Sequence, residues 1–376
     1  MSTVRAIELR SIRLPLVRPF RTSFGTSTDK VCVLVRVETD EAEGWGECVA
    51  DVEPGFSEEF NDSAWLVLRD HLAPRVLRED DIGIDDLARV LSPVRGNPMA
   101  KAALIDAFVD AELRARGVPL ATWLGADRRR VACGVSIGIT ETTEELVEQV
   151  DGYLAEGYRR IKLKIEPGID LERVAAVRAA HPDIALSVDA NAAYSIDDLA
   201  VFRALDEHAL LMIEQPLHHG DLVRHAELQR AIDTDICLDE SIRSAADAMA
   251  ALQLGSCRVV NIKQGRVGGI VEARRVHDVC LAGGVPVWCG GMLETGLGRA
   301  QNLALAAMPG FTLPGDTSAS ARYFREDLTE PFVMAADGTM AVPTGPGIGV
   351  SPRAERLSET TIRTEVATRE GYAGKV

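Results

Sequence analysis

The chain has 376 residues, 46% of them hydrophobic, so it can bury a large core in one to three domains. Its formal net charge is −16 and it has no basic cluster, which argues against nucleic acid or an anionic membrane as a partner. The sequence has no apolar run near the roughly 18 residues of a membrane span, and its N-terminus does not resemble a signal peptide. Seven cysteines without a C-x-x-C pair favour reduced thiols over a disulfide frame or zinc site. We therefore expect a cytoplasmic protein.

The first 125 residues predict a mixed α+β unit. Three runs alternate like strands of a half-exposed antiparallel sheet: 4–16, 30–40 and 43–48. Between the first two runs, residues 18–29 predict a polar loop that carries Phe20 and Phe24. Helical periodicity follows at 57–76, 84–91 and 98–116.

From about residue 131 the pattern changes to alternating strands and helices. Eight short apolar runs predict strands, the last one weakly: 131–138, 159–165, 183–190, 209–216, 235–241, 258–264, 284–291 and 311–316. Helical stretches lie between them: 142–157, 170–180, 196–205, 221–231, 244–254, 268–283 and 294–308. Seven or eight βα units predict a parallel (β/α)₈-type barrel. We expect an α+β unit over 1–125, the barrel over 126–320, and a segment over 321–376 that packs back on the first unit.

Five charged residues recur at or near the C-terminal ends of successive predicted strands: Lys164, Asp189, Glu214, Asp239 and Lys263. Neighbouring members are 25, 25, 25 and 24 residues apart, which is the length of one ordinary βα unit. Side chains alternate along a strand, and one face of each barrel strand points inward. The five groups are therefore expected together inside the C-terminal mouth, where barrel active sites lie.

Three carboxylates on adjacent strands repel one another unless a cation lies among them. Their oxygen atoms suit a hard divalent cation, Mg²⁺ first and Mn²⁺ second. The two lysines then flank the carboxylates, and a buried lysine beside other cations has its pKa lowered toward the roughly 7–8 of a general base. Lys162 and Arg266 are candidates for such neighbouring charges. Two bases on opposite sides of a metal-bound carboxylate can remove the proton α to it and return one from either face. The metal would stabilise the enediolate that forms between the two steps.

Two other classes of barrel use part of this pattern. A Schiff-base lyase needs one buried lysine but neither a metal nor three acids. A barrel that has lost catalysis is disfavoured because all five positions keep a charged residue. Sensitivity to EDTA with rescue by Mg²⁺ separates the metal mechanism from both.

The motifs around these residues resemble those of the enolase superfamily, in its muconate-lactonizing subgroup, over nearly the whole chain. They are "KLK" at 162–164, "VDAN" with Asp189, "IEQP" with Glu214, "LDES" with Asp239 and "NIKQGRVGG" with Lys263. The resemblance implies a (β/α)₇β barrel with an α+β capping domain built from both termini. It also implies site roles: Mg²⁺ ligands Asp189, Glu214 and Asp239, acid/base residues Lys164 and Lys263, and supporting residues Lys162, Arg266, Asn191 and Glu240. The mandelate racemase pattern, with a histidine in place of Lys263, is absent.

Residues 290–320 resemble the stretch found in o-succinylbenzoate synthases that also racemise N-succinylamino acids. The resemblance implies racemisation of N-acylamino acids, dehydration to o-succinylbenzoate in menaquinone biosynthesis, or both. Dipeptide epimerases usually carry an Asp-x-Asp motif, which residues 287–296 lack. Dipeptide epimerase and muconate-type cycloisomerase remain the alternatives within the subgroup.

The expected substrate contacts come from both units. The turn at 290–293 opens a predicted helix, whose free N–H groups suit a carboxylate or acyl oxygen. Loops at about 20–29 and 50–60 are expected to close over the mouth, with Phe56 and two other phenylalanines against an apolar side chain or ring. The predicted contacts are Ser136, Asn261, Gly291, Met292, Leu293, Phe20 and Phe24. A homo-oligomer is expected for a barrel enzyme of this size.

Overall fold

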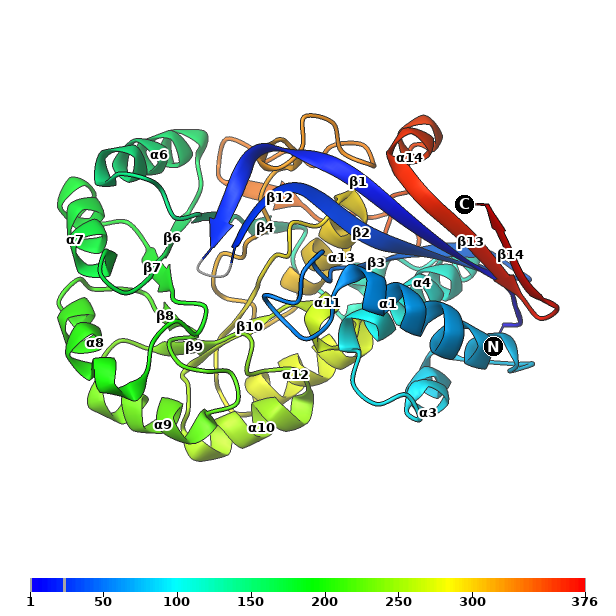
Figure 1. Cartoon of the computed structure of the whole chain (residues 1–376), viewed down its shortest axis with the longest axis horizontal. Helices are drawn as coiled ribbons and strands as arrows, with labels where there is room; N and C mark the ends of the chain where they lie inside the picture. The colour runs from blue at the N-terminus through cyan, green and yellow to red at the C-terminus, as the bar shows by residue number, and fades with distance from the viewer. Residues whose placement is uncertain (1, 23–24, 376) are drawn as a thin grey trace.

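The computed structural model describes residues 2–22 and 25–375 and contains an antiparallel sheet and a parallel barrel (Figure 1). The antiparallel sheet has the order β14-β13-β1-β2-β3. Its strands are β1 (Val4–Thr22), β2 (Gly25–Thr39), β3 (Glu43–Cys48), β13 (Thr361–Thr368) and β14 (Gly371–Lys375). Two of the five strands come from the end of the chain, and β13 pairs with β1 in the register Ile7↔Ala367.

The β1–β2 hairpin is longer than the sequence predicts. Residues 18–29 were expected to form a loop, but pairing continues through Phe20↔Ser27 to Thr22↔Gly25, after an irregularity that begins at Pro15. Proline cannot donate to the ladder, and the polar residues beyond it lack the alternation that marks a half-buried strand. The hairpin reaches from the sheet to the barrel, where Ile139 N–H donates to the Arg21 carbonyl at 3.1 Å (Figure 1). Phe24 lies outside the described residues.

Helices of the N-terminal unit follow the first three strands, and the longest of them covers one face of the sheet. They are α1 (Asn61–Val67), the π-helical turn η1 (Leu68–Leu72), α2 (Ala73–Leu77), the 3₁₀ turn η2 (Ile84–Asp86), α3 (Leu87–Leu91), α4 (Pro98–Ala115) and α5 (Leu120–Leu124). The long helix α4 packs on β2 and β3. Gly46 faces α4 closely enough that an added Cβ would lie 2.9 Å from the Ala107 nitrogen. Because side chains alternate along β3, its neighbour Glu47 points away from α4.

The barrel consists of seven parallel strands in the order β11-β10-β9-β8-β7-β6-β5. These are β5 (Gly134–Ile137), β6 (Arg160–Lys164), β7 (Leu186–Asp189), β8 (Ile213–Glu214), β9 (Ile236–Leu238), β10 (Val259–Ile262) and β11 (Val287–Cys289). Single parallel bridges Val287↔Phe311 and Cys133↔Gly315 place residues 311–316 between β11 and β5, so this weak eighth run closes the barrel. The predicted barrel with a separate α+β unit is confirmed.

The barrel helices follow the expected alternation. They are α6 (Thr143–Glu156), α7 (Asp170–Ala180), the 3₁₀ turn η3 (Ile196–Asp198), α8 (Leu199–Asp206), α9 (Leu222–Ala231), α10 (Ala245–Leu254), α11 (Gln264–Val267), α12 (Ile270–Ala282) and α13 (Gly296–Ala306). The short helix α11 was not predicted, and it starts directly after Lys263.

The last part of the chain returns to the antiparallel sheet. After the 3₁₀ turn η4 (Ser320–Arg322), strand β12 (Thr339–Ala341) pairs with β4 (Arg130–Ala132), and α14 (Ala354–Thr360) leads into β13. Over the described ranges 2–22 and 25–375, the structure contains no helix with the length and apolarity needed to cross a membrane.

Candidate active site

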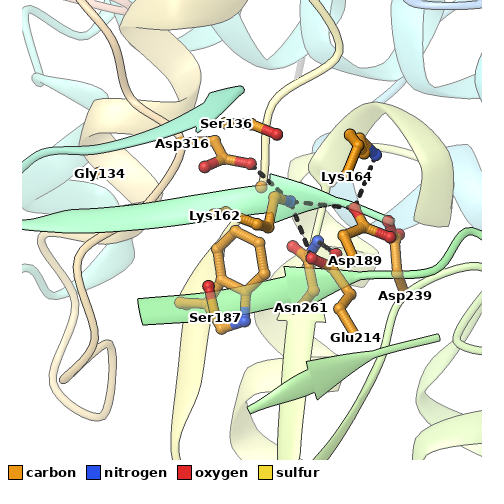
Figure 2. Close-up of polar contacts among 12 residues, drawn as sticks. Gly134, Ser136, Lys162, Lys164, Ser187, Asp189, Glu214, Asp239, Asn261 and Asp316 are labelled. Carbon is orange, nitrogen blue, oxygen red and sulfur yellow. Dashed lines mark hydrogen bonds and ion pairs between the residues drawn. The ribbon is translucent and has the colours of Figure 1, made fainter. Parts of the chain in front are cut away.

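The five charged residues lie at one end of the barrel. Lys164, Asp189 and Glu214 are the last residues of three adjacent strands and stand in register with one another. Asp239 and Lys263 directly follow β9 and β10. Successive parallel strands thus place all five side chains at the carboxyl end of the sheet. Figure 2 shows four of them, Lys164, Asp189, Glu214 and Asp239.

The three carboxylates are almost completely buried, with residue exposures of 1% for Asp189 and 0% for Glu214 and Asp239. Burial alone would raise the pKa of Asp189, but the nearby ammonium groups of Lys164 and Lys162 lower it below its usual range. The pKa of Glu214 is raised, first by burial and then by the neighbouring charge of Asp189. The mouth therefore concentrates negative charge that needs cations close by.

Lys162 lies in the middle of the acids. Its Nζ is 2.8 Å from Glu214 Oε2, 3.2 Å from Asp189 Oδ2 and 2.9 Å from Asp316 Oδ2 (Figure 2). It also sits 4.7 Å from the ring centre of Trp288. Burial would lower the pKa of Lys162, but the three carboxylates raise it well above its usual value. The sequence suggested Lys162 as a like charge acting on Lys164. In the structure that charge is compensated by carboxylates, so Lys162 organises the acids.

The two candidate bases lie on strands separated by β7, β8 and β9. Lys164 Nζ is 2.7 Å from Asp189 Oδ2 and 2.5 Å from Asn191 Oδ1. Lys263 Nζ is 2.7 Å from Asp239 Oδ2 and 4.6 Å from the ring centre of Phe56. A Cβ on Gly290 would lie 2.7 Å from Lys263 Cε, so glycine at this position leaves room for the lysine.

The other predicted supporting residues fix these groups in place. Arg266 donates to Asp239 Oδ1, to the Ile242 carbonyl at 3.0 Å and to the Asn261 carbonyl at 2.9 Å. Arg266 and Lys263 thus bind the two different oxygen atoms of Asp239, and Arg266 influences Lys263 indirectly by holding this carboxylate. On the other side, Asn191 links Lys164 to Glu240 through a 3.0 Å hydrogen bond.

The three carboxylates offer only oxygen donors, which suits a hard divalent cation. Asp239 Oδ2 is buried, and its partner among the described residues is the ammonium group of Lys263 at 2.7 Å. Across residues 2–22 and 25–375, no three His, Cys, Asp or Glu side chains already form a ligand set, because ammonium groups lie against these carboxylates. The donor chemistry of Asp189, Glu214 and Asp239 fits Mg²⁺.

A cavity of about 530 Å³ opens at this end of the barrel and lies between the mouth and the hairpin. Both candidate bases line it, as does Asn191. Its wall also contains most of the predicted substrate contacts: Ser136, Phe20, Phe56, Gly291, Met292 and Leu293. The Ser136 hydroxyl is buried and has no hydrogen-bond partner in the described part of the chain. Asn261 is not in the wall, because its amide donates to Glu214 Oε1 at 2.7 Å beneath the site.

The N-terminus of α13 is not free to hold a substrate, contrary to the expectation from the sequence. Glu47 accepts hydrogen bonds from the N–H groups of Thr295 and Gly298, and Asp327 accepts from Gly296 N–H at 2.9 Å. These acids lie far from α13 in the sequence, so local patterns could not reveal them.

Asp316 is the main site residue that the sequence analysis missed. It lies in the eighth strand-like run and pairs with Lys162 at 2.9 Å and with Arg160 at 2.6 Å. Burial would raise the pKa of Asp316, but these two cations lower it below its usual range. Its position at the end of the last predicted strand was the available signal, which the weak strand pattern obscured.

Two family models match the chain: the mandelate racemase/muconate lactonizing enzyme N-terminal domain over residues 6–125, and the enolase C-terminal domain-like model over residues 145–356. The N-succinylamino acid racemase of an Amycolatopsis species is 55% identical over 94% of this chain and 96% of its own. The o-succinylbenzoate synthase of Geobacillus stearothermophilus is 49% identical over 98% and 99%. The crystal structure of an enolase superfamily member from Listeria innocua has a TM-score of 0.94 at 39% identity, covering 98% of this chain and 100% of that one.

Proposed function

Because the chain belongs to the enolase superfamily, with both mandelate racemase/muconate lactonizing enzyme domains, we propose that it removes the proton α to a substrate carboxylate. The proposed reaction is racemisation of N-succinyl and other N-acylamino acids, dehydration of a cyclohexadiene acid to o-succinylbenzoate, or both. The relatives named for these two reactions match at 55% and 49% identity over nearly the full length. The chain is accordingly an enzyme of the isomerase or lyase type.

One observation carries the proposal. Lys164 and Lys263 line the same cavity from the ends of two strands that have three others between them, and each is paired with a different carboxylate. An amino acid whose α-carbon lies between them presents one face to each ammonium or amine group. Two lysines in this arrangement can exchange the roles of acid and base, as racemisation requires.

In the racemase reaction, Lys164 takes the α-proton from one enantiomer and Lys263 delivers a proton to the opposite face. The reverse direction uses the same groups in exchanged roles. In the synthase reaction, Lys164 takes the proton and passes it to the departing hydroxyl group, which leaves as water, while Lys263 stays cationic and stabilises negative charge on the substrate.

The residues Asp189, Glu214 and Asp239 would hold Mg²⁺, or Mn²⁺ in its place. When bound there, the cation supplies positive charge that stabilises the negative charge developing on the substrate carboxylate. Arg266 orients Asp239, and Lys162 orients Asp189 and Glu214, through the contacts described above.

The test is an assay of the purified protein with the cyclohexadiene acid, with a panel of N-succinylamino acids and with dipeptides, each with Mg²⁺ and with EDTA. We expect aromatic product or the opposite N-succinyl enantiomer, loss of both with EDTA, and recovery with Mg²⁺. Activity on dipeptides alone would instead favour the epimerase alternative. Activity that persists in EDTA, together with an imine trapped by borohydride, would contradict the metal mechanism in favour of a Schiff-base lyase.

We also infer a cytoplasmic homo-oligomer. All seven cysteines are buried and free, which suits a reducing compartment. Light scattering coupled to size-exclusion chromatography tests the assembly, and a mass near the 40.6 kDa of one chain would contradict it.

A further inference from the structure

We propose that two buried charged residues of the antiparallel sheet, Lys30 and Glu47, hold the barrel loop 291–295 in a strained shape, and that Lys30 thereby positions this loop for the acyl arm of the substrate. The acyl arm rests on the proposed function, whereas the restraint on the loop does not.

Lys30 on β2 restrains the middle of the loop. It is 2% exposed, and its Nζ donates to the Met292 carbonyl at 2.8 Å. Burial would lower the pKa of Lys30, but nearby groups including Asp51 and Glu47 raise it, so the ammonium stays charged. Its hydrogen bond to Met292 is therefore made by a charged donor with little water to compete.

Glu47 on β3 restrains the end of the loop. It is fully buried and accepts from the Thr295 hydroxyl at 2.7 Å, from Thr295 N–H at 3.1 Å and from Gly298 N–H at 3.2 Å. A carboxylate at this place also complements the positive end of α13. The sheet thus binds the loop at two points. Lys30 binds the Met292 carbonyl, and Glu47 binds N–H groups at the start of α13.

The loop between the Lys30 and Glu47 contacts has a strained backbone. Leu293 has a φ of +57°, a conformation that a branched side chain rarely adopts and that persists only when its surroundings impose it. Loop residues 291–293 line the cavity, and their N–H groups have no acceptor among residues 2–22 and 25–375. Backbone N–H groups next to a left-handed residue form a concave site for oxygen anions. The acyl carbonyl or terminal carboxylate of an N-succinyl substrate is the chemistry that fits them.

The test compares Lys30→Met with Lys101→Met. Lys101 serves as the control because it is half-buried and, like Lys30, donates to a backbone carbonyl, that of Val94, away from the cavity. Hydrogen–deuterium exchange of the ligand-free protein is measured on peptides covering 290–298. We expect at least about tenfold faster exchange in Lys30→Met, the effect of one lost charge-assisted hydrogen bond, and no change there in Lys101→Met. Unchanged exchange in Lys30→Met would overturn the proposal.

Kinetics give the second readout. We expect Lys30→Met to raise KM for N-succinylamino acids by about tenfold while kcat stays within about threefold, because the lost contact positions the acyl arm and moves no proton. Faster exchange with an unchanged KM would overturn the positioning role. A protein inactive on every N-acylamino acid would refute the racemase part of the proposed function, and the exchange data would still decide whether Lys30 restrains the loop. If Lys30→Met does not fold, the double variant Lys30→Gln/Asp51→Asn removes an acid together with the ammonium and takes its place in the exchange measurement.

Discussion

Replacing Asp316 by asparagine removes a carboxylate that faces two buried cations. The side chain keeps its shape, but Lys162 loses a partner at 2.9 Å and Arg160 loses one at 2.6 Å. Lys162 still has Glu214 at 2.8 Å, whereas Arg160 keeps, within the described part of the chain, the Pro314 carbonyl and the face of Trp288. Removing one member of a buried ion pair costs about 3–5 kcal/mol, so the free energy of unfolding should fall by that amount at pH 7.

The pH dependence of this loss has a definite sign. The pKa of Asp316 is lowered in the folded protein, so its stabilising contribution is present above the unfolded value of about 3.9 and is lost as the pH falls toward the folded value. The difference between wild type and Asp316→Asn should therefore be full at pH 7 and shrink below about pH 4.

The assay is urea unfolding, followed by the fluorescence of Trp288 and the other tryptophans. Asp235→Asn is the control, because Asp235 pairs with exposed Arg258 at 3.2 Å and such surface pairs contribute about 0–1 kcal/mol. A loss in Asp316→Asn no larger than that of the control would refute the view that Asp316 anchors Lys162 and the eighth strand.

Three further changes test other parts of the site and its frame. Lys263→Ala should slow α-hydrogen exchange of one N-succinyl enantiomer by about 10²–10⁴ while the other continues to exchange through Lys164; equal loss for both enantiomers, read by proton NMR, would contradict two opposed bases. Asp239→Asn should weaken Mg²⁺ binding by at least about tenfold in calorimetry, and an unchanged affinity would exclude Asp239 as a ligand. Burial raises the pKa of Asp106 to about 8, so the folded state resists its ionisation and loses stability as the pH rises from about 4 to 8. Asp106→Asn removes this dependence, so its free energy of unfolding minus that of wild type should be larger at pH 9 than at pH 5. The same difference at both pH values would refute the raised pKa of Asp106.

The sequence was sufficient to predict the barrel and the arrangement of its central charges. A constant interval of about 25 residues means that each charged residue occupies the same point of its βα unit, and parallel strands bring such points together. The roles of Lys164, Lys263 and the three acids as base and ligand residues remain predictions, which the variants above test.

Residues that depend on contacts between the two units were not predictable. Glu47 sits in an ordinary strand pattern, and nothing near it in the sequence indicates that it accepts from Thr295, 248 residues away. The hairpin at 18–29 was missed because strand pairing there does not require alternating apolar residues. Lys30 was assigned to a half-exposed strand, yet contact with Met292 buries it.

The most direct test of the central claim is α-deuterium incorporation in D₂O. The protein is incubated with Mg²⁺ and a panel of N-succinyl-L-amino acids, and each product is examined by NMR and chiral chromatography. The account predicts that at least one substrate gains deuterium at the α-carbon and accumulates as the D enantiomer. Absence of α-deuterium in every acylated amino acid, in a preparation that binds Mg²⁺, would contradict the racemase reaction.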